Sequence, residues 1–435
     1  MNRAMKQSGI PWIGAIPSHW RIARLKDLRA NKPYAIVDGP FGSAISANDY
    51  RDEGVPLVRI VNLTGKYVDD STTMHISPEL AQSVKRSAFG LKDIVFAKTG
   101  ATVGKCSINN SIEYGILSSS CVKISIAETF NSHYFYYFFC TNQFNLALRL
   151  ACGGSTRDTI NLTPFSNLPC IVPPLTEQQS IAEFLNVKCG EIDEMISLQE
   201  KIIEELKAYK QAIILETVTK GLNPDAPMKE SGIDWVGIIP VSWDVMAFRR
   251  LFAIKKTIAA EEGWDVLSVT QQGLKVKDLS SNEGQMADDY SNYQRVQPGD
   301  FVMNHMDLLT GWIDISKFSG VTSPDYRVFQ IRDNSVSRRY FLYIFQACYK
   351  GKIFYHLGQG VSGQGRWRLP AKQMLLFKLP VPSIEEQNAI VEFLDAKTFE
   401  IDSLISLKKA KIESLKEYKQ SIIYEYVTGK KIVNA

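Results

Sequence analysis

The sequence has little that points to metal chemistry or to disulfide-stabilised folds. Its five histidines show no H-x-x-x-H or H-E-x-x-H spacing, so the patterns that put two metal ligands on one helix face are missing. Its seven cysteines include no C-x-x-C pair and no regular framework, which is typical of reduced thiols in a cytosol. No carboxylate pair suggests a catalytic acid and base. We therefore expect neither a metal site nor a catalytic centre in this chain.

Long apolar runs and a large excess of one charge are also missing. No segment approaches the ~18 consecutive apolar residues of a membrane span, and the start of the chain lacks the apolar run of a signal peptide. The 50 Lys and Arg nearly balance the 46 Asp and Glu, and the net charge of +4 permits nucleic acid as a partner without arguing for it. We expect a cytoplasmic protein with no membrane partner.

Three fragments resemble nucleotide or cofactor motifs without meeting their requirements. GATVGK (100–105) is one residue short of the Walker A spacing. GQGVSG (358–363) fits G-x-G-x-x-G, but Pro370 stands close behind it, where a phosphate-binding helix should begin. NKPY (31–34) has a lysine where adenine methyltransferases have the first proline of N-P-P-Y. We expect no cofactor in this chain.

The sequence does contain a large internal repeat. Shifted by 209, residues 176–219 fall on 385–428 with 25 identities in 44 pairs. Shifted by 223, SGIPWIGAIPSHW (8–20) falls on SGIDWVGIIPVSW (231–243), and we call these two segments the tags. At 435 residues the chain is too long for one ordinary core, and the repeat is too long for a solenoid. The repeat therefore predicts a duplicated domain and a pseudo-two-fold molecule.

The segments between the tags and the repeated ends are more divergent but still related. Residues 92–105 resemble 299–312, and residues 153–162 lie over 362–371. Short β-like runs and one aromatic, helix-like stretch in each half predict α/β (α+β) domains. We expect domain boundaries at 1–172 and 223–380 for two variable domains, and at 173–222 and 381–435 for two helical spacers. The tag tryptophans are expected to be structural clamps.

The repeated ends are predicted to be long helices. Thr176 and Ser383 follow prolines and are expected N-caps, while Gly221 and Gly429 are expected to end the helices. Unbroken, 44 residues would span ~66 Å at ~1.5 Å per residue. A bend near 189–190 or 398–399 is a further expectation.

Each predicted helix carries an apolar stripe at heptad-like steps. An antiparallel pairing of the two helices would use this stripe and hold the variable domains apart; the alternative is that each helix packs on its own domain. We assign the stripe to helix pairing or partner binding, and its members are Phe184, Leu185, Ile192, Ile196, Ile203, Leu206, Tyr209, Ile213, Phe393, Leu394, Ile401, Ile405, Ile412, Leu415, Tyr418 and Ile422.

The loops of the variable segments are rich in Gly, Ser, Thr, Asn, Gln and Arg. Glycine lets the backbone approach a phosphate, lysine neutralises it, and Arg, Asn and Gln can recognise base edges. Ordinary surface turns have a similar composition, and Trp367 could instead belong to the core. The candidate DNA-binding residues are Gly42, Ser43, Lys98, Thr99, Thr102, Lys105, Ser155, Thr156, Arg157, Asn304, His305, Gln364, Arg366 and Trp367.

These motifs together resemble the specificity subunit of type I restriction–modification enzymes. The most specific part is the doubled EQ--I--FL and YKQ-II-E-VT helix, and the tags, GPFGS, VPLVRIVNL and KTGATVGK also match that family. The resemblance covers nearly the whole chain. Missing methyltransferase and helicase motifs agree with it, because in this family they belong to partner chains.

The resemblance implies a non-catalytic DNA-recognition subunit. Each variable domain would read one half of a bipartite, asymmetric site on double-stranded DNA, with half-sites about one helical turn, ~34 Å, apart. The helices would set the gap and dock two methyltransferase subunits that carry S-adenosylmethionine and methylate adenine N6. Restriction subunits, a motor–nuclease using ATP and Mg²⁺, would join them. A stand-alone methyltransferase or nuclease, and a scaffold that binds only protein, remain the alternatives.

Overall fold

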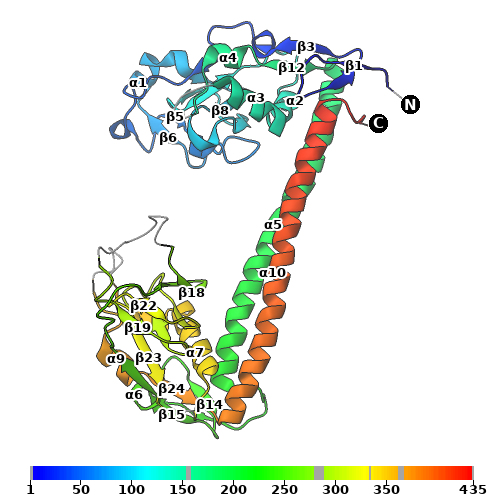
Figure 1. The fold of residues 1–435 in the computed structure, drawn as a ribbon. Helices are drawn as coiled ribbons and strands as arrows, with labels where there is room; N and C mark the ends of the chain where they lie inside the picture. The colour runs from blue at the N-terminus through cyan, green and yellow to red at the C-terminus, as the bar shows by residue number, and fades with distance from the viewer. Residues whose placement is uncertain (1–2, 153–157, 279–288, 333–334, 361–366, 434–435) are drawn as a thin grey trace. The chain divides into compact units, whose positions relative to one another are not determined.

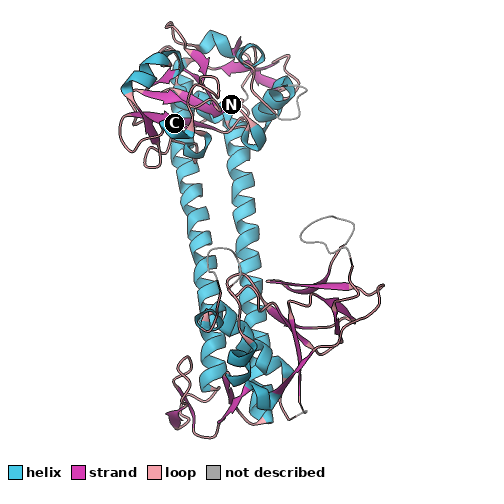
Figure 2. Cartoon of the chain, turned by 90° about the vertical axis from the view of Figure 1, so that its left-hand side faces the viewer, coloured by secondary structure: helices cyan, strands magenta, loops and turns pink. Residues whose placement is uncertain are grey.

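The chain, in a computed structural model, is described for residues 3–152, 158–278, 289–332, 335–360 and 367–433 (Figure 1). It divides into two compact units, unit 1 comprising Met1–Gln199 and Ala410–Ala435, and unit 2 comprising Glu200–Lys409. Each unit therefore combines one β-rich domain with portions of both long helices. Figure 2 shows the strands confined to the β-rich domain of each unit.

Unit 1 contains two four-stranded sheets and two short strand pairs. One sheet has the order β4-β11-β8-β9, with all neighbours antiparallel: Ile36–Asp38, Cys121–Ile124, Ile94–Ala97 and Cys106–Ile108. The other has the order β6-β5-β10-β7, in which β10 runs parallel to β5: Met74–Ile76, Val55–Val58, Gly115–Leu117 and Ala88–Phe89. The pairs are β1-β2 (Met5–Gln7, Ala15–Pro17) and β12-β3 (Pro169–Val172, Arg21–Arg24).

Unit 2 repeats this topology strand for strand. One sheet has the order β16-β23-β20-β21: Phe252–Lys255, Arg327–Ile331, Phe301–Met303 and Ile313–Ile315. The other has the order β18-β17-β22-β19, again with one parallel pair: Gly273–Val276, Val266–Thr270, Gly320–Thr322 and Gln294–Val296. The pairs are β13-β14 (Met228–Glu230, Ile238–Pro240) and β15-β24 (Asp244–Ala247, Lys378–Val381). The predicted α/β duplication is confirmed.

The shorter helices cover the sheets. In unit 1 they are α1 (Pro78–Ser83), α2 (Ser132–Phe139), α3 (Asn142–Cys152) and α4 (Leu162–Ser166). In unit 2 they are α6 (Phe248–Leu251), α7 (Arg338–Lys350), α8 (Ile353–His356) and α9 (Ala371–Leu376). The aromatic run YFYYFF forms most of α2, and all six of its side chains are buried in the core. That run is therefore a core helix, in accord with its length.

The repeated ends form the helices α5 (Leu175–Lys220) and α10 (Ile384–Val427), which run without interruption through the points where a bend was expected. Ser383 caps α10, since its Oγ accepts from Glu386 N at 3.3 Å. The prediction for Thr176 is wrong: α5 begins one residue earlier, and Gln178 N donates to the carbonyl of Pro174. Pro174 already supplies the first turn's acceptor, which leaves Thr176 inside the helix.

In unit 1 the two helices are antiparallel neighbours. The rings of Phe184 and Tyr426 stack with centroids 4.4 Å apart, and Lys419 Nζ lies 2.6 Å from Asp193 Oδ2. Residue numbers thus rise along one helix as they fall along the other. Within unit 1 the two helices lie side by side in both views (Figures 1 and 2).

Unit 2 repeats the antiparallel pairing. Lys210 Nζ lies 2.6 Å from Asp402 Oδ2, and a Cβ added at Gly221 would stand 2.9 Å from Glu386 Oε1. The predicted antiparallel coiled coil is therefore confirmed within each unit.

The predicted apolar stripe is mostly buried. Half-buried members are Phe184, Ile196, Leu206, Ile213 and Phe393, and fully buried members are Leu185, Ile192, Ile203, Leu394, Ile401, Ile405, Ile412, Leu415 and Ile422. Tyr209 and Tyr418 instead lie outside the buried seam, with 54% and 57% of their surface exposed. They remain available to a partner.

Each hydrophobic core is completed by the helix end of the other repeat. Ile423 and Val427 of α10 pack into the core of unit 1, while Ile214 and Val218 of α5 pack into the core of unit 2. Burying side chains of this size contributes roughly 1.5–3 kcal/mol each. Each long helix therefore packs on its own domain at its start and on the domain of the other repeat at its end. Helix pairing and packing of each helix on its own domain, which were the two alternatives, both occur in part.

The tags receive these helix ends. Trp20 and Trp243 are fully buried, and their indole Nε1 atoms donate to Glu177 and Glu386 at 3.0 and 2.9 Å. Gly429 and Gly221 end the helices with positive φ, and a Cβ at either would press on the tag tryptophan, at 2.9 Å from Trp20 and 3.2 Å from Trp243. Trp20 and Trp243 are structural clamps, as predicted.

Candidate nucleic-acid interface

In unit 1 the predicted DNA-binding residues gather at one end of β8. Lys98 and Thr99 follow directly after this strand and are half-buried. Lys98 N donates to the carbonyl of Ser120 at 2.7 Å, its own carbonyl accepts from Ile160 N at 2.8 Å, and Thr99 forms a β-bridge with Thr159. These bonds tie the turn after β8 to the segment that follows residues 153–157.

We call the turn after β8 and the loops around it the unit 1 corner. The other predicted residues of this corner are exposed or lie outside the described residues. Gly42, Ser43, Thr102 and Lys105 are exposed. The turn needs glycine at 104, because its φ is +90° and a Cβ would meet Asn145 Oδ1 at 2.1 Å. The candidates Ser155, Thr156 and Arg157 lie outside the described residues.

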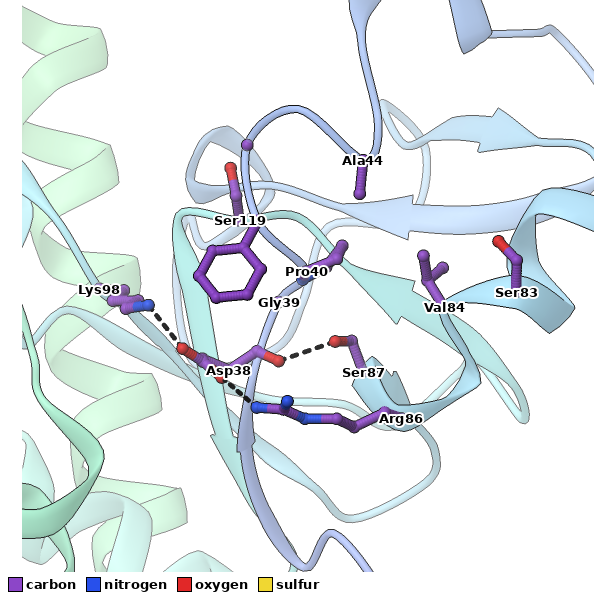
Figure 3. A pocket seen from close by; sticks show the side chains of 12 residues that line it. Asp38, Gly39, Pro40, Ala44, Ser83, Val84, Arg86, Ser87, Lys98 and Ser119 are labelled. Atoms are coloured by element: carbon purple, nitrogen blue, oxygen red, sulfur yellow. Dashed lines mark hydrogen bonds and ion pairs between the residues drawn. The ribbon is translucent and has the colours of Figure 1, made fainter.

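Asp38, which sequence reasoning missed, organises the corner (Figure 3). Its Oδ2 accepts from Lys98 Nζ at 2.6 Å, its Oδ1 from Arg86 Nη2 at 3.3 Å, and its backbone carbonyl from Ser87 Oγ at 2.8 Å. Lys98 and Asp38 are each about one-fifth exposed. One carboxylate thus aligns two cations beside a cavity of about 330 Å³ that also includes Gly42 and Ser119. Asp38 precedes the GPFGS motif, but nothing in the sequence linked it to Arg86.

In unit 2 the candidates Asn304 and His305 directly follow β20, and His305 holds the place that Lys98 has after β8. The carbonyl of Asn304 accepts from Tyr349 OH at 2.7 Å, and that of His305 accepts from Leu369 N at 2.9 Å. Leu308 N donates to the carbonyl of Trp367 at 3.1 Å. The turn after β20 is therefore tied to the segment behind the glycine-rich loop, as in unit 1.

Trp367 is held as part of this framework. Its Nε1 donates to the carbonyl of Tyr355 at 2.7 Å, and its ring lies against Gly358, where a Cβ would stand 2.3 Å from Nε1. The side chain is half-buried at the edge of the core, which supports the reading of Trp367 as a core residue. The candidates Gln364 and Arg366 lie outside the described residues.

Arg327, another residue that sequence reasoning missed, adds a buried positive charge next to the turn after β20, which we call the unit 2 corner. It is only 8% exposed, and its partners in the described part of the chain are Met374 Sδ at 3.1 Å and the carbonyl of Leu369 at 3.3 Å. Burial and the nearby guanidinium groups of Arg327 and Arg368 lower the pKa of His305 to about 4. His305 is therefore neutral near pH 7 and can donate or accept one hydrogen bond.

In the part of the chain that the structure describes, no group of three or more His, Cys, Asp or Glu side chains is placed to hold a metal ion. No helix in that part is long and apolar enough to cross a membrane.

Comparisons with known proteins give one consistent result. The sequence model described as "Type I restriction modification DNA specificity domain" matches twice, at residues 37–208 and 243–417. The type I restriction enzyme MjaVIII specificity subunit of Methanocaldococcus jannaschii is 24% identical over 95% of this chain and 93% of its own length. The EcoBI specificity subunit of Escherichia coli is 22% identical over 89% of this chain and 83% of its own.

Solved structures share the fold. The HsdS subunit from Thermoanaerobacter tengcongensis aligns over 96% of this chain and 98% of its own, with a TM-score of 0.51 and 15% identity. A chain from a study of complex assembly and conformational transition of the type I R-M system aligns over 96% and 99%, with a TM-score of 0.69 and 14% identity.

Proposed function

This chain belongs to the type I restriction–modification DNA specificity family, and from that premise we propose that each β-rich domain reads one half of a bipartite DNA target. The observation that carries the proposal is the repeated corner after β8 and β20, which has one framework but different side chains. Ala97 and Lys98 stand in unit 1 where Asn304 and His305 stand in unit 2, because their backbone groups make the corresponding hydrogen bonds. Readers of one fold with unlike side chains select unlike bases, so the target is asymmetric.

The charges at each corner suit a nucleic acid. Lys98 and Arg86 in unit 1, and Arg327 and Arg368 in unit 2, offer positive charge close to backbone that carries the candidate base-reading side chains. Phosphate contacts give affinity and position, while base contacts give sequence preference. Binding should therefore weaken as salt concentration rises.

The long helices are proposed to set the gap between half-sites and to dock two methyltransferase subunits. Supporting this, apolar and aromatic side chains stay exposed at matching positions of the two copies. Leu198 and Leu407 are 55% and 66% exposed, and Tyr209 and Tyr418 repeat the pattern. Aromatic residues are enriched at protein interfaces. Because the same exposed residues recur on both helices, the two surfaces would suit two copies of one partner.

The catalytic work is assigned to the partners. The methyltransferase subunits would carry S-adenosylmethionine and methylate adenine N6, and the restriction (motor–nuclease) subunits would use ATP and Mg²⁺ for cleavage. This chain would contribute sequence choice and assembly, without chemistry of its own. The complex would act on DNA in the cytoplasm.

The test is a map of N6-methyladenine in cells that express this chain together with its methyltransferase subunit. We expect one motif of two unlike half-sites separated by an unspecified gap of constant length. Cells with the methyltransferase subunit alone provide the control and should show no such motif. A single unbroken motif, or methyl transfer by the purified chain alone, would refute the proposal.

A further inference from the structure

The tip of the loop after β4 carries an exposed aromatic side chain. Phe41 is 87% exposed, the highest value for a large apolar residue in the described part of the chain. A ring left in water lacks the stabilisation that burial in an apolar environment would give it. Phe41 also lines the cavity beside Asp38 and Lys98.

The backbone on both sides of Phe41 is anchored. Gly39 N donates to the carbonyl of Cys121 at 2.9 Å, and Gly39 lies so close to Ser118 that a Cβ would stand 1.9 Å from its carbonyl oxygen. Ala44 N donates to the carbonyl of Phe41 at 2.8 Å and closes the turn. An aromatic ring on an anchored turn loses little conformational freedom on binding, because the backbone is already ordered.

The surroundings of Phe41 favour DNA over protein as the ligand. Lys98 and Arg86 share one carboxylate, Asp38, so the three groups carry a net positive charge beside the ring. Lys105 adds a further exposed cation in the turn after β8. Exposed aromatic rings next to phosphate-binding cations are the pattern with which proteins stack on bases or wedge between them.

We propose that Phe41 stacks on, or inserts between, bases of the first half-site, while Asp38 positions Lys98 and Arg86 for the adjoining phosphates. This inference rests on the proposed function, since it requires unit 1 to read DNA. Phe41 contacts the bases directly, whereas Asp38 acts through the two cations and is a positioning residue.

The effect belongs to one half-site only. In unit 2 the strand equivalent to β4 is β16, and the residues that follow it, KTIAAE (256–261), contain no Gly-Pro-Phe-Gly turn. The two domains therefore share a framework but would contact DNA through different residues. Unit 1 would use the aromatic ring of Phe41, and unit 2 would use the buried Arg327 together with the neutral His305.

The experiment uses the complex of this chain with its methyltransferase subunits and duplexes that carry 2-aminopurine at successive steps of the mapped first half-site. The variants are Phe41→Ala, Phe41→Tyr and, as matched control, Leu91→Ala. Leu91 is 49% exposed in the same unit but lies before β8, at the opposite end of the strand from Lys98.

We expect Phe41→Ala to weaken binding to the full target by about 5- to 140-fold, from the ~1–3 kcal/mol that base–aromatic stacking contributes. Phe41→Tyr should retain most of the binding, because its ring can still stack, and Leu91→Ala should bind like the unaltered chain. Fluorescence at one step of the first half-site should rise on binding of the unaltered chain and not of Phe41→Ala, because a wedge unstacks that step. Fluorescence at the second half-site should not change between variants.

The variant Asp38→Asn tests the positioning role of Asp38 separately, because it removes a negative charge and leaves the ring of Phe41 in place. Loss of a negative charge should strengthen binding to non-specific DNA, yet discrimination at the first half-site should fall because the two cations lose their alignment. Stronger binding with unchanged discrimination would overturn the positioning role.

Two results would overturn the wedge while leaving the proposed function intact: sequence-specific binding and fluorescence that Phe41→Ala does not alter, or a Phe41→Ala defect confined to assembly with the methyltransferase subunits. Absence of any sequence preference in the unaltered complex would instead refute the proposed function, and this inference with it.

Discussion

At the scale of single residues, one carboxylate in the first turn of each long helix fastens the tag to it. Acidic side chains are favoured there by the helix dipole. Glu177 accepts from Trp20 and also from His19 Nε2 at 2.6 Å and from Arg3, whereas Glu386 accepts from Trp243. Burial opposes ionisation of Glu177, but these hydrogen bonds outweigh it and lower its pKa.

Replacing Glu177 with alanine should lower the free energy of unfolding by about 1–3 kcal/mol, because the buried indole N–H of Trp20 loses its acceptor. A carboxyl whose pKa is lowered on folding stabilises above its ordinary pKa of 4.5 and loses that contribution as pH falls through the folded value. Urea unfolding from pH 7 down to pH 3 should therefore show a shallower acid dependence for Glu177→Ala than for the unaltered chain.

The matched variant is Glu386→Ala. It should lower the free energy of unfolding at pH 7 by a similar amount, since it also leaves a buried indole N–H, that of Trp243, without its acceptor. An acid dependence that is the same in the unaltered chain and in Glu177→Ala would contradict this account of the clamp.

At the scale of elements, the long helices derive their stability from tertiary burial along a heptad-like stripe rather than from capping alone. Seam residues such as Ile192 and Ile412 in unit 1, and Ile203 and Ile401 in unit 2, are less than one-tenth exposed. The stripe recurs every seven residues, so whole heptads preserve the face that each helix presents.

Inserting one heptad into both helices, between Gln199 and Glu200 and between Lys409 and Ala410, should lengthen the gap between half-sites by about three base pairs. Seven residues add ~10.5 Å of helix, and base pairs are spaced ~3.4 Å apart. The methylation map of the variant should show both half-sites unchanged. A five-residue insertion, which turns the stripe by ~140°, is the control and should abolish a defined motif. An altered half-site with an unaltered gap would count against a ruler.

At the scale of the whole molecule, each unit has a core completed by a helix from the other repeat. Unit 1 needs α10 to complete its core, and unit 2 needs α5. Near the two ends of the chain, Arg3 and Val433 line one cavity of about 330 Å³ in unit 1. The segment 222–225 that joins α5 to the second tag is exposed.

A circular permutant that joins residue 433 to residue 3 by a short linker and opens the chain between Asn223 and Pro224 should keep the fold. No core contact of either unit is cut, and exposed connections tolerate new termini. We expect a Tm within a few degrees of the unaltered chain and the same methylated motif. Opening the chain inside α5, between Ile203 and Glu204, is the control and should destabilise both cores. Loss of folding in the first permutant alone would show that the tag must follow α5 covalently.

Much of this organisation could be predicted from particular residues. Repeats such as Trp20 with Trp243 revealed the duplication, and Gly221 with Gly429 marked the helix ends because a left-handed residue ends a helix locally. Lys98 and Asn304 lie in the turns after β8 and β20, within the loops that the sequence singled out, and their contact with DNA stays a prediction. Asp38 with Arg86, and Arg327 with His305, were out of reach because each pair joins residues of distant strands or turns.

The sequence alone determined the duplication, the long helices and several of the strands, because periodicity, capping and turn chemistry act over a few residues. Only the tertiary structure decided that each helix end completes the core of the other repeat, that Tyr209 and Tyr418 stay outside the seam, and that Asp38 aligns two cations beside Phe41. Those outcomes depend on which distant surfaces exclude water together, and no local pattern encodes that.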